Sequence, residues 1–136
     1  MPLLEYREVQ YDGVHCHLAV EWFPPGTVVL RISGSDIGEF GEAPMQALSG
    51  WLADHQPVDF FIDARDVRVA SIEVSGEWAR WLGIHKQDLR TVTMLTGSRF
   101  VNMTAEFVRR FADLTQMKIC TEPAVFDRAL AEAMQS

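Results

Sequence analysis

The sequence lacks several features that mark particular classes of protein. It holds only two cysteines, Cys16 and Cys120, in 136 residues, so we expect no disulfide framework. No apolar run approaches the about 18 uncharged residues that a membrane-spanning helix needs. The first residues show no basic start followed by an apolar stretch, as a secretory signal would. We therefore expect a cytoplasmic protein with no membrane span.

Basic residues are also scarce. Twelve Lys and Arg stand against 19 Asp and Glu, which gives a net charge of −7 and a pI near 5.0. A nucleic-acid binder needs a basic face to displace the counterions of the phosphates, and anionic lipid also attracts basic segments. We expect neither nucleic acid nor an anionic membrane surface as a partner.

Motifs for cofactors and catalysis are missing as well. There is no GxGxxG and no GxxxxGK[ST], which argues against dinucleotide-binding and P-loop enzymes. His15 and His17 share one face of an expected strand, but no third ligand follows at a spacing typical of a metal site. His55 and His85 fall at expected helix ends, where a cation suits the helix dipole. We expect no cofactor, no metal and no catalytic residue.

The composition is that of one globular domain spanning residues 1–136, with 48% hydrophobic and 23% charged residues. Alternating apolar residues predict strands, and apolar residues three and four apart predict helices. The expected strands cover residues 4–11, 14–22, 27–33, 58–63, 90–96 and 117–121. The expected helices cover residues 44–55, a segment around 78–83, a segment around 107–114, and 123–134 with Thr121 as N-cap.

This order of elements predicts an α/β fold. Asp12-Gly13 is a hairpin turn signal, so residues 1–26 form an antiparallel hairpin at the edge of the sheet. Residues 27–136 form the α/β core, in which helical crossovers make the strands parallel. We expect a mixed sheet of five to six strands covered by four helices. In the third helix we expect Phe107, Val108, Phe111 and Leu114 to form the apolar stripe.

Two clusters of polar residues lie at and after the expected strand 58–63. Asp63, Arg65 and Asp66, together with Asp59, cluster around its carboxyl end, where open α/β sheets bind ligands. They form either an acid–base site or an ion-pair network, and we favour the network because no nucleophile lies beside them. Ser71 and Ser75 precede or open the next helix, either as N-caps or as phosphorylation sites, since a helix N-terminus favours a dianion.

The segments VVLRISG and VDFFIDARDV, followed by the Ser75-Gly76 helix start, resemble the STAS family over residues 27–134. That family includes anti-sigma-factor antagonists of the SpoIIAA type, and its fold is related to Sec14-type lipid-binding domains. In the family, an acidic residue precedes a phosphorylated serine. Here Glu73 is followed by Val74, and an ungapped placement from Asp63 instead puts Ile72 at the acceptor position. The usual acceptor is therefore missing, and Ser75, shifted by one residue, is a possible substitute.

The resemblance implies a non-enzymatic bacterial signalling or protein-interaction module without the usual phospho-acceptor serine. The alternative is a small protein that binds an apolar ligand or lipid, for which eight Phe, four Trp and six Met provide lining. An enzyme that uses the Asp63 cluster is a third hypothesis. The expected partner or ligand surface comprises Asp63, Arg65, Asp66, Glu73, Ser75, Gly76, Trp78 and Trp81.

The acidic residues of this surface indicate a partner with a basic face. The resemblance implies that such a partner is a kinase or an anti-sigma-like protein. Homodimerisation through the edge of the N-terminal hairpin is a further possibility.

Overall fold

The structure is a computed structural model that describes residues 5–54 and 57–135. It contains six strands, four α-helices and one 3-10 turn among these residues. The strands are β1 (Arg7–Asp12), β2 (Cys16–Phe23), β3 (Thr27–Asp36), β4 (Val58–Ala70), β5 (Leu89–Thr96) and β6 (Met117–Cys120). The helices are α1 (Ala43–Asp54), α2 (Ile72–Ile84), η1 (Lys86–Asp88), α3 (Arg99–Phe111) and α4 (Pro123–Met134).

The six strands form one mixed sheet in the order β1-β2-β3-β4-β5-β6. β1, β2 and β3 pair antiparallel, whereas β3 to β6 pair parallel. This confirms the predicted fold class: an antiparallel hairpin at one edge, followed by parallel β-α units. The exposed edge strand β1 carries Arg7, Glu8 and Asp12, charges of the kind that discourage edge-to-edge pairing. Dimerisation through this edge stays a prediction.

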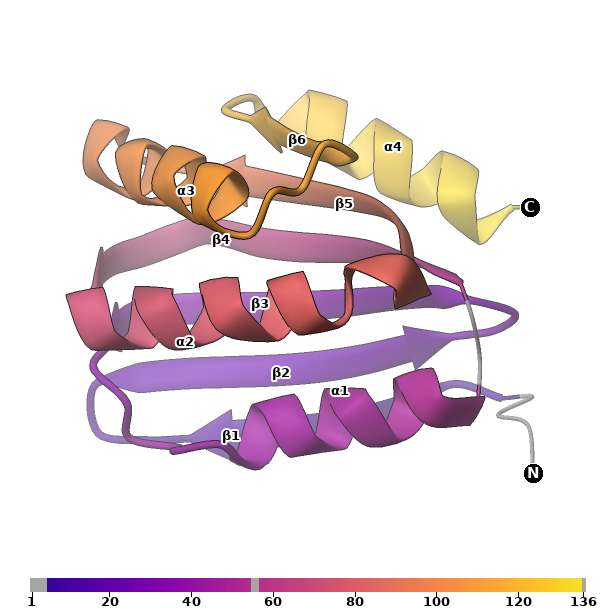
Figure 1. The fold of residues 1–136 in the computed structure, drawn as a ribbon, viewed down its shortest axis with the longest axis horizontal. Coiled ribbons are helices and arrows are strands. Elements are labelled where there is room, and N and C mark those ends of the chain that lie inside the picture. Colours follow the sequence, from indigo (N-terminus) through magenta and orange to yellow (C-terminus); the bar gives the residue numbers. More distant parts are fainter. Residues whose placement is uncertain (1–4, 55–56, 136) are drawn as a thin grey trace.

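The strand order also decides where the helices lie. Each parallel crossover moves one strand further in the same direction, and such crossovers are right-handed, so their helices fall on one face. Figure 1 shows α1, α2 and α3 together in front of the strands. The last helix, α4, packs on the opposite face, against Val29, Phe61 and Leu95.

The two faces differ in what they bury. The face under α1, α2 and α3 holds the main core, which includes Leu30, Phe60 and Ile62 from the sheet. The other face has only a small apolar cluster beneath α4, centred on Phe126. Because alternate residues of a strand point to opposite faces, β4 supplies both clusters from consecutive positions.

The strand that follows α1 is longer than we predicted from the sequence. We expected it to end at Asp63, but β4 continues to Ala70 because its second half still pairs with β3, from Ser33↔Asp66 to Asp36↔Ala70. Residues 64–70, which we had assigned to no element, are therefore part of the strand, and α2 begins at Ile72, well before the expected helical segment around 78–83. Asp59 lies near the start of β4, so its expected place at the carboxyl end was wrong.

The stripe predicted for the third helix was also partly wrong. Val108 is buried, and Leu114 is buried just beyond the end of α3, but Phe107 is 53% and Phe111 64% exposed. The helix turns its small residues inward instead, including Ala105, because it packs closely on α2 and the sheet.

Smaller differences concern element ends. The N-cap of α4 is Glu122 rather than Thr121, and it makes no capping bond through its side chain. Leu4 and His55, which we placed at an expected strand start and helix end, lie outside the described residues. Cys16 and Cys120 are both free. In the part of the chain that is described, no helix is long and apolar enough to cross a membrane.

Candidate functional site

The eight residues expected to form one surface lie on two sides of the sheet. Asp63, Arg65 and Asp66 belong to β4 and line a groove on the side of α4. The other five belong to α2, on the opposite face: Glu73, Ser75, Gly76, Trp78 and Trp81. Proximity in the sequence was misleading here, because the turn from β4 into α2 carries the chain across to the other face of the sheet.

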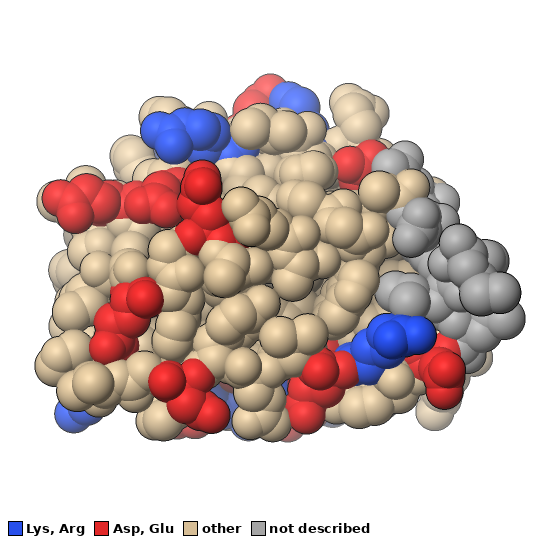
Figure 2. Space-filling model, turned by 90° about the horizontal axis from the view of Figure 1, so that it is seen from below, with Lys and Arg blue, Asp and Glu red and all other residues tan. Residues whose placement is uncertain are grey.

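The groove lies over the half of the sheet that α4 leaves open, and its volume is about 640 Å³. Carboxylates outnumber cations along it, so its electrostatic potential is negative. Its acidic residues are Glu8, Asp12, Glu21, Asp63, Asp66 and Asp127, and its basic residues are Arg31 and Arg65, with His17 beside them. Figure 2 shows the side of the molecule formed by β1 and α1, where acidic side chains are widespread and basic ones are few.

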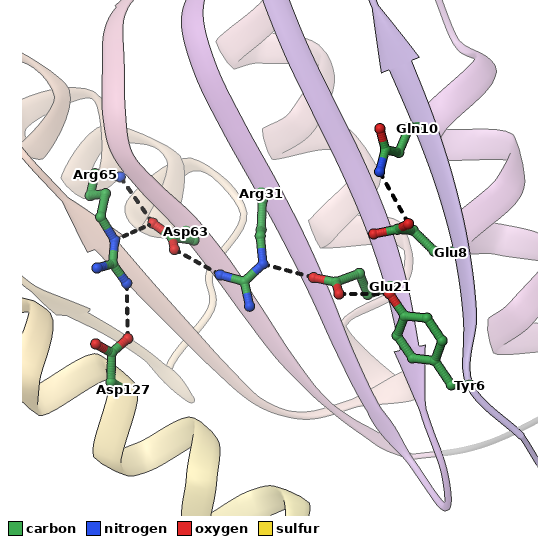
Figure 3. A network of polar contacts seen from close by, with 8 residues as sticks. All are labelled: Tyr6, Glu8, Gln10, Glu21, Arg31, Asp63, Arg65 and Asp127. Atoms are coloured by element: carbon green, nitrogen blue, oxygen red, sulfur yellow. Dashed lines mark hydrogen bonds and ion pairs between the residues drawn. The ribbon is translucent and has the colours of Figure 1, made fainter.

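A chain of ion pairs crosses the floor of the groove (Figure 3). Arg31 stands between two buried carboxylates: its Nε lies 2.7 Å from Glu21 Oε1, and its Nη1 lies 3.0 Å from Asp63 Oδ2. Tyr6 donates its hydroxyl to Glu21 Oε2 at 2.9 Å. Partial burial and this hydrogen bond raise the pKa of Tyr6. The phenol therefore stays protonated and acts as a donor at neutral pH.

Arg65 extends the same chain to α4. Its backbone N and its Nε donate to Asp63 Oδ1 at 3.2 and 3.0 Å, and its Nη2 donates to Asp127 at 2.9 Å. The hydrogen bonds to Asp63 and then to Asp127 raise the pKa of Arg65. Asp63 thus accepts three hydrogen bonds, and the network ties β2, β3, β4 and α4 into a fixed arrangement.

The sequence pointed to only part of this network. Asp63 and Arg65 were predicted from their position, and the ion-pair interpretation of their contacts agrees with the geometry. Glu21, Arg31 and Asp127 were missed because they come from three other elements. One signal was available for Arg31: it interrupts the apolar run Val28-Val29-Leu30 and lies on the same strand face as Val29.

The start of α2, where the resemblance places a phosphorylated serine, has a different character. Ser71 is the N-cap, and its Oγ accepts a hydrogen bond from Val74 N at 3.1 Å. Ser75 is only 8% exposed and faces an apolar cavity between α2, α3 and the sheet. A kinase would have to withdraw Ser75 from the helix interface to reach it. Phosphorylation of Ser71 or Ser75 stays a prediction.

The two tryptophans of α2 serve mainly as packing residues. Trp81 is 7% exposed and belongs to the main core, and Trp78 is half-buried against it at 5.9 Å between ring centroids. Both rings are therefore less available to a partner than we expected from their spacing.

The cavity beside Ser75 measures about 70 Å³ and is almost entirely apolar. Its one carboxylate is Asp36, which is 6% exposed at the end of β3 and accepts a bond from Gly38 N at 3.4 Å. Burial raises the pKa of Asp36. An engineered cavity of about 150 Å³ binds benzene, so this one is too small for a lipid chain unless the helices separate.

A serine, a histidine and an aspartate stand in line between α1 and η1. Ser49 Oγ lies 3.2 Å from His85 Nε2, and His85 Nδ1 lies 3.2 Å from Asp88 Oδ2. This is the order of a hydrolase triad, but Ser49 lies inside α1, where backbone N–H groups bond within the helix and cannot form an oxyanion hole. Trp81 Nε1 also donates to Ser49 Oγ at 2.9 Å. These hydrogen bonds therefore connect α1 to the C-terminal end of α2.

Metal ligands do not converge. His17 is exposed and lies 3.0 Å from Asp12, and His15 is also exposed. Across residues 5–54 and 57–135, no three His, Cys, Asp or Glu side chains are placed to hold a metal ion.

Comparison with known proteins identifies the fold. A protein of the DUF3478 family from Shewanella loihica PV-4, described as having a SpoIIAA-like fold, superposes with a TM-score of 0.63. The match covers 88% of this chain and 98% of that one, at 14% sequence identity. The fold is SpoIIAA-like. No family model and no curated protein matches the sequence. The likeness is therefore one of architecture alone, and a shared fold does not by itself assign a function.

Proposed function

We propose that this protein is a non-enzymatic regulatory module that binds a basic segment of a partner protein in its acidic groove. The observation that carries this is the groove itself, where the network through Glu21, Arg31 and Asp63 fixes the floor and leaves the carboxylates of Glu8 and Asp66 exposed. A rigid site in which carboxylates outnumber cations attracts and orients a basic segment at little cost in conformational entropy.

The chemistry of the candidate nucleophiles supports a non-enzymatic role. Burial raises the pKa of Cys16 to about 11, and burial also raises that of Cys120. Both thiols are therefore protonated at neutral pH, and a thiol is a poor nucleophile. The carboxylate of Asp63 is occupied by two arginines and cannot readily act as a general base.

A matched pair of charge-reversal variants tests the groove. The probe is a nona-arginine peptide, titrated into the ¹⁵N-labelled full chain. We expect amide shifts along β2, β3 and β4 and weaker binding at higher salt, because surface electrostatics are screened. Glu8→Lys/Asp66→Lys should raise Kd by about tenfold. Glu42→Lys/Glu122→Lys changes the net charge equally at sites away from the groove and should have little effect.

Equal losses of affinity in the two double variants would mean that only net charge matters, and the groove would then be abandoned as the binding site. Amide shifts confined to α2 and α3 would lead to the same conclusion. A basic kinase or an anti-sigma-like protein is the kind of partner that the resemblance implies, and either can replace the peptide in this assay.

The apolar cavity is the observation that favours the alternative, a carrier of an apolar ligand. Its volume of about 70 Å³ makes this the second choice. Native mass spectrometry of the purified chain separates the two functions. A carrier should retain a bound molecule of lipid-sized mass. The Val101→Trp variant, whose larger side chain fills the cavity, should lose it. A single species at the mass of the chain alone argues against the carrier.

A further inference from the structure

An exposed apolar stripe runs along α3. Phe100, Met103, Phe107 and Phe111 lie 56%, 67%, 53% and 64% exposed. Their spacing of three, four and four residues places them on one face of the helix, over about 16 Å. With about 200 Å² of surface for each aromatic side chain, the exposed part is roughly 400 Å², which is the size of patch that marks interaction sites on monomers.

This stripe is separate from the face that holds α3 in the fold. Val101, Ala105 and Val108 are buried and contact the sheet and α2. The helix is therefore already packed without its large side chains. Solvent exposure of three phenylalanines on a well-packed helix costs free energy that folding does not recover, which points to a partner.

Charge indicates what kind of partner. α3 carries three arginines and one glutamate in a chain of net charge −7. Arg109 pairs with Glu106, whereas Arg99 and Arg110 are exposed and form no ion pair with any residue in the described ranges. Arg99 and Arg110 lie four before and seven after Met103, so both border the same edge of the stripe.

We propose that α3 is the docking surface for an amphipathic helix of another protein, whose apolar face is bordered by carboxylates. Three turns of such a helix match the length of the stripe. Carboxylates about eleven residues apart along one edge would reach Arg99 and Arg110 in an antiparallel arrangement. Phenylalanines at the centre would supply most of the affinity, and the arginines would select the orientation.

Two other occupants fit less well. An anionic membrane would have to attract a molecule of net charge −7. A second copy of this chain, packed about a two-fold axis with antiparallel helices, would bring Arg99 of one protomer toward Arg110 of the other, and like charges repel. The proposal also does not depend on the acidic groove, which lies on the opposite face of the sheet.

The test uses two synthetic 18-residue helices with the same leucine face, one bordered by glutamates and the other by lysines. Binding to the full chain is measured by fluorescence anisotropy. We expect the glutamate helix to bind at least tenfold tighter. Phe107→Ala should weaken it by tenfold or more, and Arg110→Glu should reverse the preference between the two helices.

Ile84→Ala on α2 and Arg128→Glu on α4 are the matched controls, an exposed apolar residue and an exposed arginine away from the stripe, and both should bind as the parent does. Nona-arginine binding to Phe107→Ala should also be unchanged, which separates this proposal from the groove.

Three results would overturn the proposal. The first is equal binding of the two helices or no effect of Phe107→Ala. The second is Phe107-dependent binding to vesicles of one part phosphatidylglycerol and three parts phosphatidylcholine, which would make the occupant a membrane. The third is a dimer in analytical ultracentrifugation that Phe107→Ala dissociates, which would make it a second copy.

Discussion

The two faces of β4 show how one strand can serve two purposes. Phe60 and Ile62 point into the main core beneath three helices, whereas Asp63 and Arg65 point toward the side that only α4 covers in part. Apolar burial on the first face stabilises the fold. On the second face, buried charges are accepted because each one is paired and hydrogen-bonded. The extent of helix cover, rather than the strand itself, sets the chemistry of each face.

The acidic groove and the α3 stripe, which lie on opposite faces of the sheet, also differ in chemistry. The groove is acidic, and its central side chains hold one another in place. The α3 stripe is apolar, and its phenylalanines are more than half exposed and do not belong to the buried face of the helix. A change in the groove network should therefore affect stability and binding together, whereas a change in the stripe should affect binding alone.

The largest effect should come from the covered face. Phe60 is 1% exposed, and Phe60→Ala should lower the free energy of unfolding by about 3–5 kcal/mol, because it leaves a cavity in the core. Phe107→Ala should change it by less than about 0.5 kcal/mol, because that ring is half-exposed. Urea denaturation of both variants measures the contrast. A large loss in Phe107→Ala would mean that the stripe is part of the core after all.

An intermediate effect should come from the ion-pair chain. Asp63→Ala leaves Arg31 and Arg65 without their shared carboxylate and should cost about 1.5–3 kcal/mol, the range for hydrogen bonds to charged groups. Asp66 lines the same groove but is exposed, so Asp66→Ala should cost less than about 0.5 kcal/mol. Thermal denaturation at low and high salt compares them. If the two variants were equally stable, the network would be a set of independent surface pairs.

The smallest effect should be a gain, and it depends on pH. Burial raises the pKa of Asp36 in the folded state, so folding favours the protonated acid. The stabilising contribution of protonated Asp36 is therefore fully present below the unfolded pKa of about 3.9. It is lost as the pH rises through the pKa of Asp36 in the folded state. Asp36→Asn stays neutral, so it should melt a few degrees higher than the parent at pH 7. The difference should vanish near pH 3.

Asp66→Asn is the control for this pH series, because Asp66 is exposed and the substitution should leave the melting temperature unchanged at either pH. A lower melting temperature for Asp36→Asn at pH 7 would show that the fold stabilises the Asp36 carboxylate as an ion, which would contradict a raised pKa.

Much of the fold could be predicted from the sequence because its signals are local. Asp12-Gly13 marked the hairpin, and the change from a strand pattern over residues 27–33 to helical spacing over residues 44–55 marked the first crossover. The end of β4 could not be predicted, because it depends on pairing with β3, a long-range contact. Val108 of α3 was assigned to the buried face correctly, but Phe107 and Phe111 were assigned to it wrongly, because they carry a stronger apolar signal than Ala105 and Val101.

The candidate site was only half visible from the sequence. Asp63 and Arg65 were identified, but Arg31, the partner of Asp63, lies 32 residues away along the chain, and Asp127, the partner of Arg65, lies 62 residues away. Glu21 joins the network only through Arg31, and no local pattern links these residues. Ser75 was assigned to a helix start, either as an N-cap or as a phosphorylation site, and the structure places it inside α2 on the buried face of the helix.

The sequence by itself determined the order of strands and helices, the antiparallel edge and the acidic balance of the chain. These follow from turn residues, periodicity and composition, which act over a few residues. Only the tertiary structure decided which carboxylates meet an arginine and which phenylalanines remain in solvent. Those outcomes depend on strand register and on how many helices cover each face. Four of the few basic residues thus have a defined place in the structure. Arg31 and Arg65 pair with the carboxylates of the groove, and Arg99 and Arg110 border the exposed stripe of α3.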